Sequence, residues 1–352
     1  MFRFFAVVIL VGSVSLPAEA QLFNWINLDR LNCRLGGCVV DYTANHGRDR
    51  RICSSILGMK RDLYVYLPPN YDPKLAYPMV LYLHTAQIDE HTLIGPGIIE
   101  TVDAMIANGD FPPAVIVCPD GTYEGSNRIK DRHSLYVNGI GGRFEDHLVQ
   151  EVVPFVNRTY SIRPEREAHV ILGTSAGGYG GMGLALKHRD LFGAIATLGG
   201  PLNMRYDNTE GRYLDDFDPA TYRWKTCYDP NEIAATYYHG LAHSRAKKYV
   251  EPVYGKGPQI INKLASDNPA DLLFTTNLQP GELAIYVNYP GNDNWNFDAQ
   301  DQSFAWLAAQ KGVEVTLVRV PGAQHSLRYF KSQQRPAYEW LGQHVLPPAP
   351  RG

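Results

Sequence analysis

Short apolar runs alternate with helical repeats along most of the chain. Five runs contain almost no polar residue and have the length of strands buried on both faces, at 63–67, 78–84, 114–118, 169–172 and 194–198. Between them, apolar residues recur at helical spacing over 98–107, 144–160 and 177–187. This alternation predicts an α/β fold with a mostly parallel sheet and helices on both faces.

The alternation stops at about residue 202 and resumes after about residue 272. The stretch between is rich in Tyr, Asp, Asn and Gly, with a helical pattern near 232–249. It predicts an insertion over the sheet edge, either a lid or an ordinary surface excursion. Beyond it we expect a strand at 283–287, a helix at 299–310, a strand at 313–320 and a last helix near 338–344.

Residues 1–20 have the layout of a cleavable secretory signal. Arg3 precedes an apolar run from Phe5 to about Leu16, and Ala18 and Ala20 supply small residues for cleavage. A membrane anchor is the alternative, but spanning a bilayer takes about 20 apolar residues. We therefore expect a secreted or periplasmic protein that is not inserted in a membrane once the signal is removed.

The remaining chain divides into three predicted parts. An Arg-rich N-terminal extension covers 21–60, the main domain covers 61–346 with its insertion at about 202–272, and a tail covers 347–352. The net charge of −3 argues against nucleic acid or an anionic membrane as a partner. The five cysteines include no Cys-x-x-Cys pair, which disfavours a zinc or redox site and leaves the disulfide pairing open.

The strongest chemical signal is Gly173-Thr174-Ser175-Ala176-Gly177-Gly178, between a predicted strand and a predicted helix. A sharp strand-to-helix turn exposes a serine hydroxyl, and its geometry requires small flanking residues. The helix start also brings backbone N–H groups beside the hydroxyl. The motif predicts Ser175 as a nucleophile, whereas a glycine-rich packing turn is the alternative.

A serine nucleophile needs a base and an acid that orients the base. His325 follows the last predicted strand and a Pro-Gly turn, so it is the candidate base. Asp293 lies closest to the end of the preceding strand and is the favoured acid. Asp298, which begins the next helix, is the alternative acid or a helix cap.

The tetrahedral intermediate of ester cleavage needs N–H donors for its oxyanion. The backbone N–H groups of Ala176 and Ala86 are the candidates, the second because it lies in the loop after the central strand, at His84-Thr85-Ala86. No metal-ligand motif or nucleotide-binding glycine pattern is present, and this chemistry requires no cofactor.

Over about residues 60–345 the chain resembles the esterase D-like family of α/β-hydrolases. The family includes feruloyl esterases, S-formylglutathione hydrolases, enterochelin esterases and mycolyltransferases. The resemblance rests on the following motifs, in order: Leu81-Tyr82-Leu83-His84, Phe144-Glu145-Asp146, Gly173 to Gly178, Gly291-Asn292-Asp293 and Pro321-Gly322-Ala323-Gln324-His325.

This resemblance implies an α/β-hydrolase fold with Ser175, Asp293 and His325 as the catalytic triad. One departure is Thr85, where the family usually has glycine. The leading hypothesis is an exported serine esterase that acts on small or carbohydrate-linked esters, with feruloyl or acetyl esters of polysaccharides as the natural guess. The alternatives are an acyltransferase with the same triad and a non-catalytic binding module.

Overall fold

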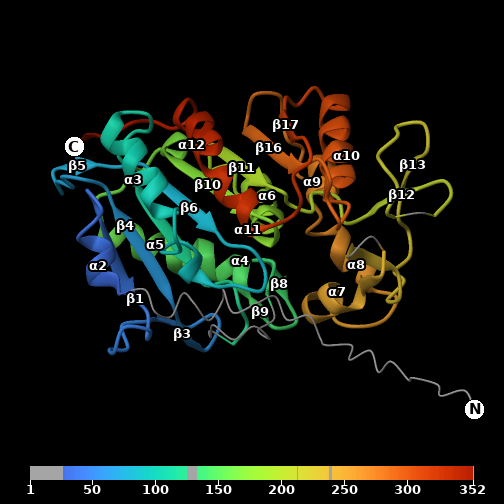
Figure 1. Ribbon diagram of the computed structural model, residues 1–352, viewed down its shortest axis with the longest axis horizontal. Helices are drawn as coiled ribbons and strands as arrows, with labels where there is room; N and C mark the ends of the chain where they lie inside the picture. The colour runs from blue at the N-terminus through green and yellow to red at the C-terminus, as the bar shows by residue number, and fades with distance from the viewer. Residues whose placement is uncertain (1–26, 125–132, 212, 238–239, 352) are drawn as a thin grey trace, which may run out of the picture.

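The computed structural model describes residues 27–351 except 125–132, 212 and 238–239. Its centre is an eight-stranded sheet (Figure 1). In spatial order, the strands are β1 (Cys38–Tyr42), β4 (Leu63–Leu67), β7 (Val115–Pro119), β6 (Met79–Leu83), β10 (His169–Thr174), β11 (Ala194–Leu198), β16 (Ala284–Pro290) and β17 (Thr316–Val320). The strands from β7 to β17 are parallel, whereas β4 is antiparallel to both β7 and β1. The predicted mostly parallel sheet is confirmed.

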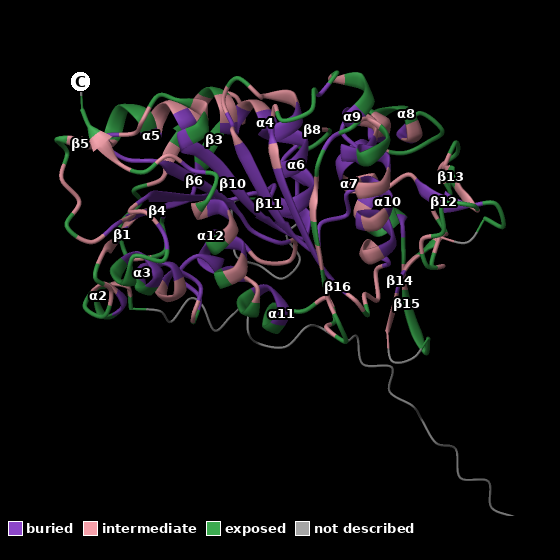
Figure 2. Ribbon diagram, turned by 90° about the horizontal axis from the view of Figure 1, so that it is seen from above, coloured by how far each residue is buried: buried purple, intermediate pink, exposed green. Residues whose placement is uncertain are grey.

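Both faces of the sheet carry an apolar core, because successive side chains of a strand point to opposite faces. In β10, Ile171 joins one cluster while Val170 and Leu172 join the other. The helices on the two faces can be followed in Figure 2. The first face is covered by α5 (Val153–Thr159), α6 (Ala176–Lys187), α9 (Pro269–Thr275) and α10 (Phe297–Gln310), and the second by α2 (Leu28–Asn32), α3 (Ile99–Asn108), α11 (Leu327–Ser332) and α12 (Gln334–Gly342).

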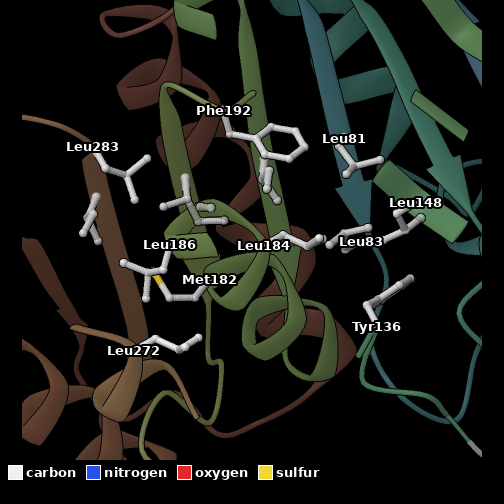
Figure 3. Close-up of a cluster of buried hydrophobic side chains, with 14 of the residues drawn as sticks. Leu81, Leu83, Tyr136, Leu148, Met182, Leu184, Leu186, Phe192, Leu272 and Leu283 are labelled. Carbon is white, nitrogen blue, oxygen red and sulfur yellow. The ribbon is translucent and has the colours of Figure 1, made fainter. Parts of the chain in front are cut away.

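Helix α6 lies in the middle of the first core. Figure 3 shows its Met182, Leu184 and Leu186 side chains among apolar side chains from the sheet and from α9. Its glycines let it approach the strands closely, since a Cβ on Gly177 would lie 2.1 Å from the carbonyl oxygen of Leu83. The helix that follows Ser175 is therefore held tightly against the sheet.

The insertion differs from its predicted helical pattern near 232–249. The structure has a hairpin there, β14 (Ile233–Tyr237) with β15 (Ala242–Arg245), and a helix only from α7 (Lys247–Tyr254) onward. Gly240 adopts a φ of 88°, which favours a turn and ends any helix. The other insertion elements are β12 (Tyr206–Asn208), β13 (Tyr222–Trp224) and α8 (Ile260–Ala265).

The predicted helix at 144–160 is divided into α4 (Phe144–His147), a π-helical turn at Leu148–Val152, and α5. The short remaining elements are β2 (Ile52–Ser54), β3 (Met59–Arg61), β5 (Leu75–Ala76), β8 (Asn138–Gly139), β9 (Gly142–Arg143), β18 (Ala349–Pro350) and 3-10 turns at Glu90–Thr92 and Arg166–Ala168. Strand β18 brings part of the tail against β5.

The predicted extension at 21–60 contributes β1, which forms the edge strand beside β4. All five cysteines are free thiols. The predicted signal at 1–20 lies outside the described residues. Within the described residues, no helix combines the length and the apolar character needed to cross a bilayer.

Candidate active site

Ser175 is the single residue between the end of β10 and the start of α6, and its backbone has φ 50° and ψ −114°. A positive φ is costly for a residue with a side chain, and such strain is typical of an exposed nucleophile at a tight turn. Its neighbours have no room for a Cβ, because one on Gly173 would lie 2.3 Å from the Gly177 carbonyl oxygen. The flanking glycines therefore make the turn possible.

The structure brings the three predicted triad side chains together. The Oγ atom of Ser175 lies 2.9 Å from Nε2 of His325. On the other side of the ring, Nδ1 of His325 lies 3.1 Å from Oδ2 of Asp293. This chain of contacts can pass a proton from the serine to the imidazole while the carboxylate fixes the ring's orientation.

The carboxylate of Asp293 is fully buried. Its second oxygen accepts a hydrogen bond from the Trp295 backbone N–H at 2.7 Å, which fixes its rotamer. Asp298 accepts from the Ala299 N–H instead, and no hydrogen bond joins it to His325 in the described structure. Burial and the neighbouring charge of Asp293 raise the pKa of Asp298 to about 6. The geometry favours Asp293 over Asp298 as the partner of His325.

Three aromatic side chains surround His325. The rings of Phe297 and Phe330 meet it edge-on, with centroids 5.1 Å and 5.0 Å away, and that of Trp295 lies at 6.2 Å. The sequence pattern did not identify these residues, although Trp295 and Phe297 lie two and four residues after the predicted acid. The His325 side chain is only 10% exposed in this setting, and low exposure to water strengthens its electrostatic contacts.

The loop after β6 is fixed by the buried His84 ring. Its Nε2 accepts a hydrogen bond from the Gly121 N–H at 3.0 Å, so Nδ1 carries the proton and donates it to the Thr85 carbonyl at 2.9 Å. Because a trans peptide points its C=O and N–H in opposite directions, the Ala86 N–H faces away from His84. The described structure contains no acceptor for this N–H.

Ala86 packs against an apolar cluster that includes Ala176. Ala176 is the first residue of α6, so its N–H belongs to the helix terminus and has no intrahelical acceptor. Gln87, next to Ala86, has a φ of 71°, a strained conformation that sequence reasoning did not identify. Ala176 thus directly follows Ser175, Ala86 packs against the cluster that contains Ala176, and the role of both N–H groups as oxyanion donors stays a prediction.

The insertion contacts both the nucleophile helix and the loop of Asp293. The hydroxyls of Tyr254 and Tyr179 lie 2.8 Å apart, which joins α7 to α6. The hydroxyl of Tyr213 donates to the Trp295 carbonyl at 3.0 Å. The insertion therefore supports the site from the side, and its role as a lid stays a prediction.

One group of described side chains could hold a metal ion, namely Asp89, Glu90 and His91, all buried. Nδ1 of His91 lies 2.9 Å from Asp89 and 3.4 Å from Glu90. Burial raises the pKa of Glu90 well above its usual range. The group contains none of the predicted triad residues.

A family model described as "Putative esterase" matches residues 54–311. Among curated proteins, Endo-1,4-beta-xylanase Y of Acetivibrio thermocellus is 29% identical over 107 residues, 30% of this chain but only 9% of that protein.

Solved structures with the same fold include a ferulic acid esterase (16% identity, TM-score 0.64, covering 89% of this chain and 100% of that one). They also include an S-formylglutathione hydrolase from Agrobacterium tumefaciens (15% identity, TM-score 0.61, 89% and 97%). Because the family model covers most of the chain, the protein belongs to the "Putative esterase" family, and its likeness to these structures shows the α/β-hydrolase fold.

Proposed function

We propose that the protein cleaves carboxylic esters through an acyl-enzyme on Ser175, with His325 as general base and acid and Asp293 as the orienting acid. The observation that carries this proposal is the 2.9 Å contact between the Ser175 hydroxyl and Nε2 of His325, at a strained strand-to-helix turn. A serine without such a base is a poor nucleophile.

In the first half of the reaction, Nε2 of His325 takes the Ser175 proton as Oγ attacks the ester carbonyl. The N–H groups of Ala176 and Ala86 stabilise the resulting oxyanion. His325 then protonates the leaving alcohol, and the acyl group remains on Ser175. In the second half, His325 takes a proton from a water molecule as the water oxygen attacks the acyl carbonyl. The bond between the acyl carbon and Oγ then breaks, His325 returns the proton to Oγ of Ser175, and the acid leaves. Asp293 holds the imidazole in the required tautomer throughout.

The proposed substrates are feruloyl or acetyl esters of polysaccharides, met outside the cell after export through residues 1–20. Similarity to a ferulic acid esterase and to part of a xylanase supports this class of ester. The rings of Trp295, Phe297 and Phe330 beside His325 also suit an aromatic or apolar group near the reacting carbonyl.

A fluorophosphonate probe, which reacts with activated serines, tests the nucleophile. We expect wild type to be labelled and Ser175→Ala not to be labelled, while p-nitrophenyl and feruloyl esters rank the acyl groups. Folded wild-type protein that is neither labelled nor active on these esters would contradict the proposal. A product that forms only when an alcohol is added would indicate acyl transfer instead of hydrolysis.

A further inference from the structure

A cleft of about 430 Å³ lies between the N-terminal segment and helix α5. Three arginines line it, Arg50, Arg51 and Arg158, and the aromatic side chains of Tyr42 and Phe155 belong to its wall. No triad residue lines the cleft. Its volume falls within the range typical of ligand sites, well above that of a single small ion.

Glu151 supplies the carboxylate that lines the cleft, and this carboxylate is hydrogen-bonded to residues outside the lining. It accepts hydrogen bonds from the Ser54 hydroxyl, from Nδ1 of His147 at 2.7 Å and from the Ser55 N–H at 2.7 Å. Burial opposes ionisation, but the hydrogen bonds from Ser54, His147 and Ser55 prevail and lower the pKa of Glu151 to about 2. Glu151 is therefore ionised but makes no ion pair with an arginine of the cleft in the described structure.

The three arginines of the cleft carry more positive charge than the nearby carboxylates neutralise. Arg51 binds Asp49 through two nitrogens, at 3.0 Å and 3.1 Å, but Asp49 also pairs with Lys60 at 2.8 Å. The guanidinium groups of Arg50 and Arg158 make no ion pair or hydrogen bond with any described residue. Two unpaired cations thus share one cleft in a chain whose net charge is −3.

The chemistry of the lining indicates the ligand. A guanidinium group binds a carboxylate through two parallel hydrogen bonds, and such charge-assisted bonds are among the strong ones. The rings of Tyr42 and Phe155 meet edge-on at 5.1 Å and give the cleft an apolar side as well. We propose that this cleft binds a polysaccharide that carries carboxylate groups, with the sugar ring against the aromatic wall and the carboxylates on Arg50 and Arg158.

The position of the cleft suits a long ligand. Tyr42 pairs with Leu63, which pairs with Pro119 at the end of β7, so the cleft begins at the edge of the sheet where the parallel strands end. Strand β10, which leads to Ser175, lies four strand spacings away, or about 19 Å. A polymer could reach both places, whereas a small ester would need only the active site. Binding in the cleft does not depend on the proposed chemistry of Ser175.

The test is calorimetric titration of the full chain with polygalacturonate, with neutral dextran as the comparison polymer. We expect polygalacturonate to bind, dextran not to bind, and Arg50→Glu/Arg158→Glu to weaken binding by at least about tenfold. Arg48→Glu/Lys256→Glu is the matched control, because it makes the same change in charge at exposed residues that do not line the cleft. Turnover of a p-nitrophenyl ester should be unchanged in both variants. If the glutamate variant does not fold, Arg50→Gln/Arg158→Gln replaces it.

Several results would overturn the proposal. One is the absence of polygalacturonate binding by wild type, and another is binding by the cleft variant that is as tight as that of wild type. An equal loss in the control variant would show a general effect of net charge. Competition by inorganic sulfate at the concentration at which free galacturonate competes would show a site for any oxyanion. Absence of p-nitrophenyl ester turnover in wild type, with polygalacturonate bound and its binding weakened only in the cleft variant, would contradict the proposed function and support the assignment of the cleft.

Discussion

At the scale of single residues, the contacts of His325 lead to a ranking of variants. Ser175→Ala and His325→Ala should each lower kcat for a p-nitrophenyl ester by roughly 10⁴ to 10⁶, because each removes part of the proposed proton-transfer unit. Asp293→Asn should lower kcat by a smaller factor, on the order of 10³ to 10⁴, since the ring can then adopt the wrong tautomer. Steady-state kinetics of the purified variants measure this ranking.

Asp298→Asn is the matched control for the acid, because both carboxylates follow the same strand and only Asp293 contacts His325. We expect Asp298→Asn to stay within a few-fold of wild-type kcat. Loss of activity in this variant, with activity kept in Asp293→Asn, would assign the acid to Asp298.

Asp298 also makes stability depend on pH. Its folded-state pKa is raised to about 6 by burial and by the charge of Asp293. The folded state therefore binds the proton more tightly than the unfolded state, and stability is lost as pH rises from about 4 to about 6. Asp298→Asn removes this cost and should be about 1–2 kcal/mol more stable than wild type at pH 7.5, after allowance for partial exposure. Urea unfolding should show that the stability gained by Asp298→Asn is smaller below pH 4 than at pH 7.5. An equal gain under the two conditions would contradict this account.

At the scale of elements, the insertion and the loop of Asp293 are joined through Tyr213. Its hydroxyl donates to the Trp295 carbonyl at 3.0 Å and accepts from Nε2 of Gln300 at 2.6 Å. Tyr213→Phe removes both bonds and should let the loop move, lowering kcat by about tenfold with little change in KM, because catalysis is sensitive to misplacement of the reacting groups.

Tyr222→Phe is the matched control for this prediction. It also removes a hydroxyl of the insertion, one that accepts from Asn203 and makes no contact with the loop of Asp293. Equal kinetic effects of the two substitutions would show that Tyr213 acts through general stability and not through the acid loop.

Elements with continuous apolar runs were predictable because burial on both faces marks them. Strands β4 and β11 have the predicted bounds, and the turn at Ser175 lies where its glycines indicate. The helical interpretation of the pattern near 232–249 was wrong, because periodicity cannot distinguish strands and helices that are only a few residues long. The rings around His325 come from separate segments, so only the folded chain shows that Phe330 faces this imidazole.

At the scale of the whole molecule, the sheet order depends on contacts that local patterns do not contain. Strand β6 lies between β7 and β10, and β1 closes the edge beside β4. The sequence pattern did not predict β1, because five residues with alternating partial burial resemble a loop. The predicted boundary at residue 61 therefore separates two strands that pair along their full length.

This pairing predicts that a chain beginning at residue 61 is strongly destabilised. The truncation would leave the backbone groups of β4 unpaired at an exposed edge, and such edges promote aggregation. It would also remove the N–H groups of Gly36 and Gly37, which donate to the buried Asp103 at 2.9 Å and 2.8 Å. A chain beginning at residue 27 keeps all these contacts and is the matched control. We expect the control to melt as one cooperative unit by circular dichroism and the shorter chain to aggregate or melt much lower. If the two melt within a few degrees of each other, residues 61–346 form a self-sufficient domain, and β1 is an accessory strand.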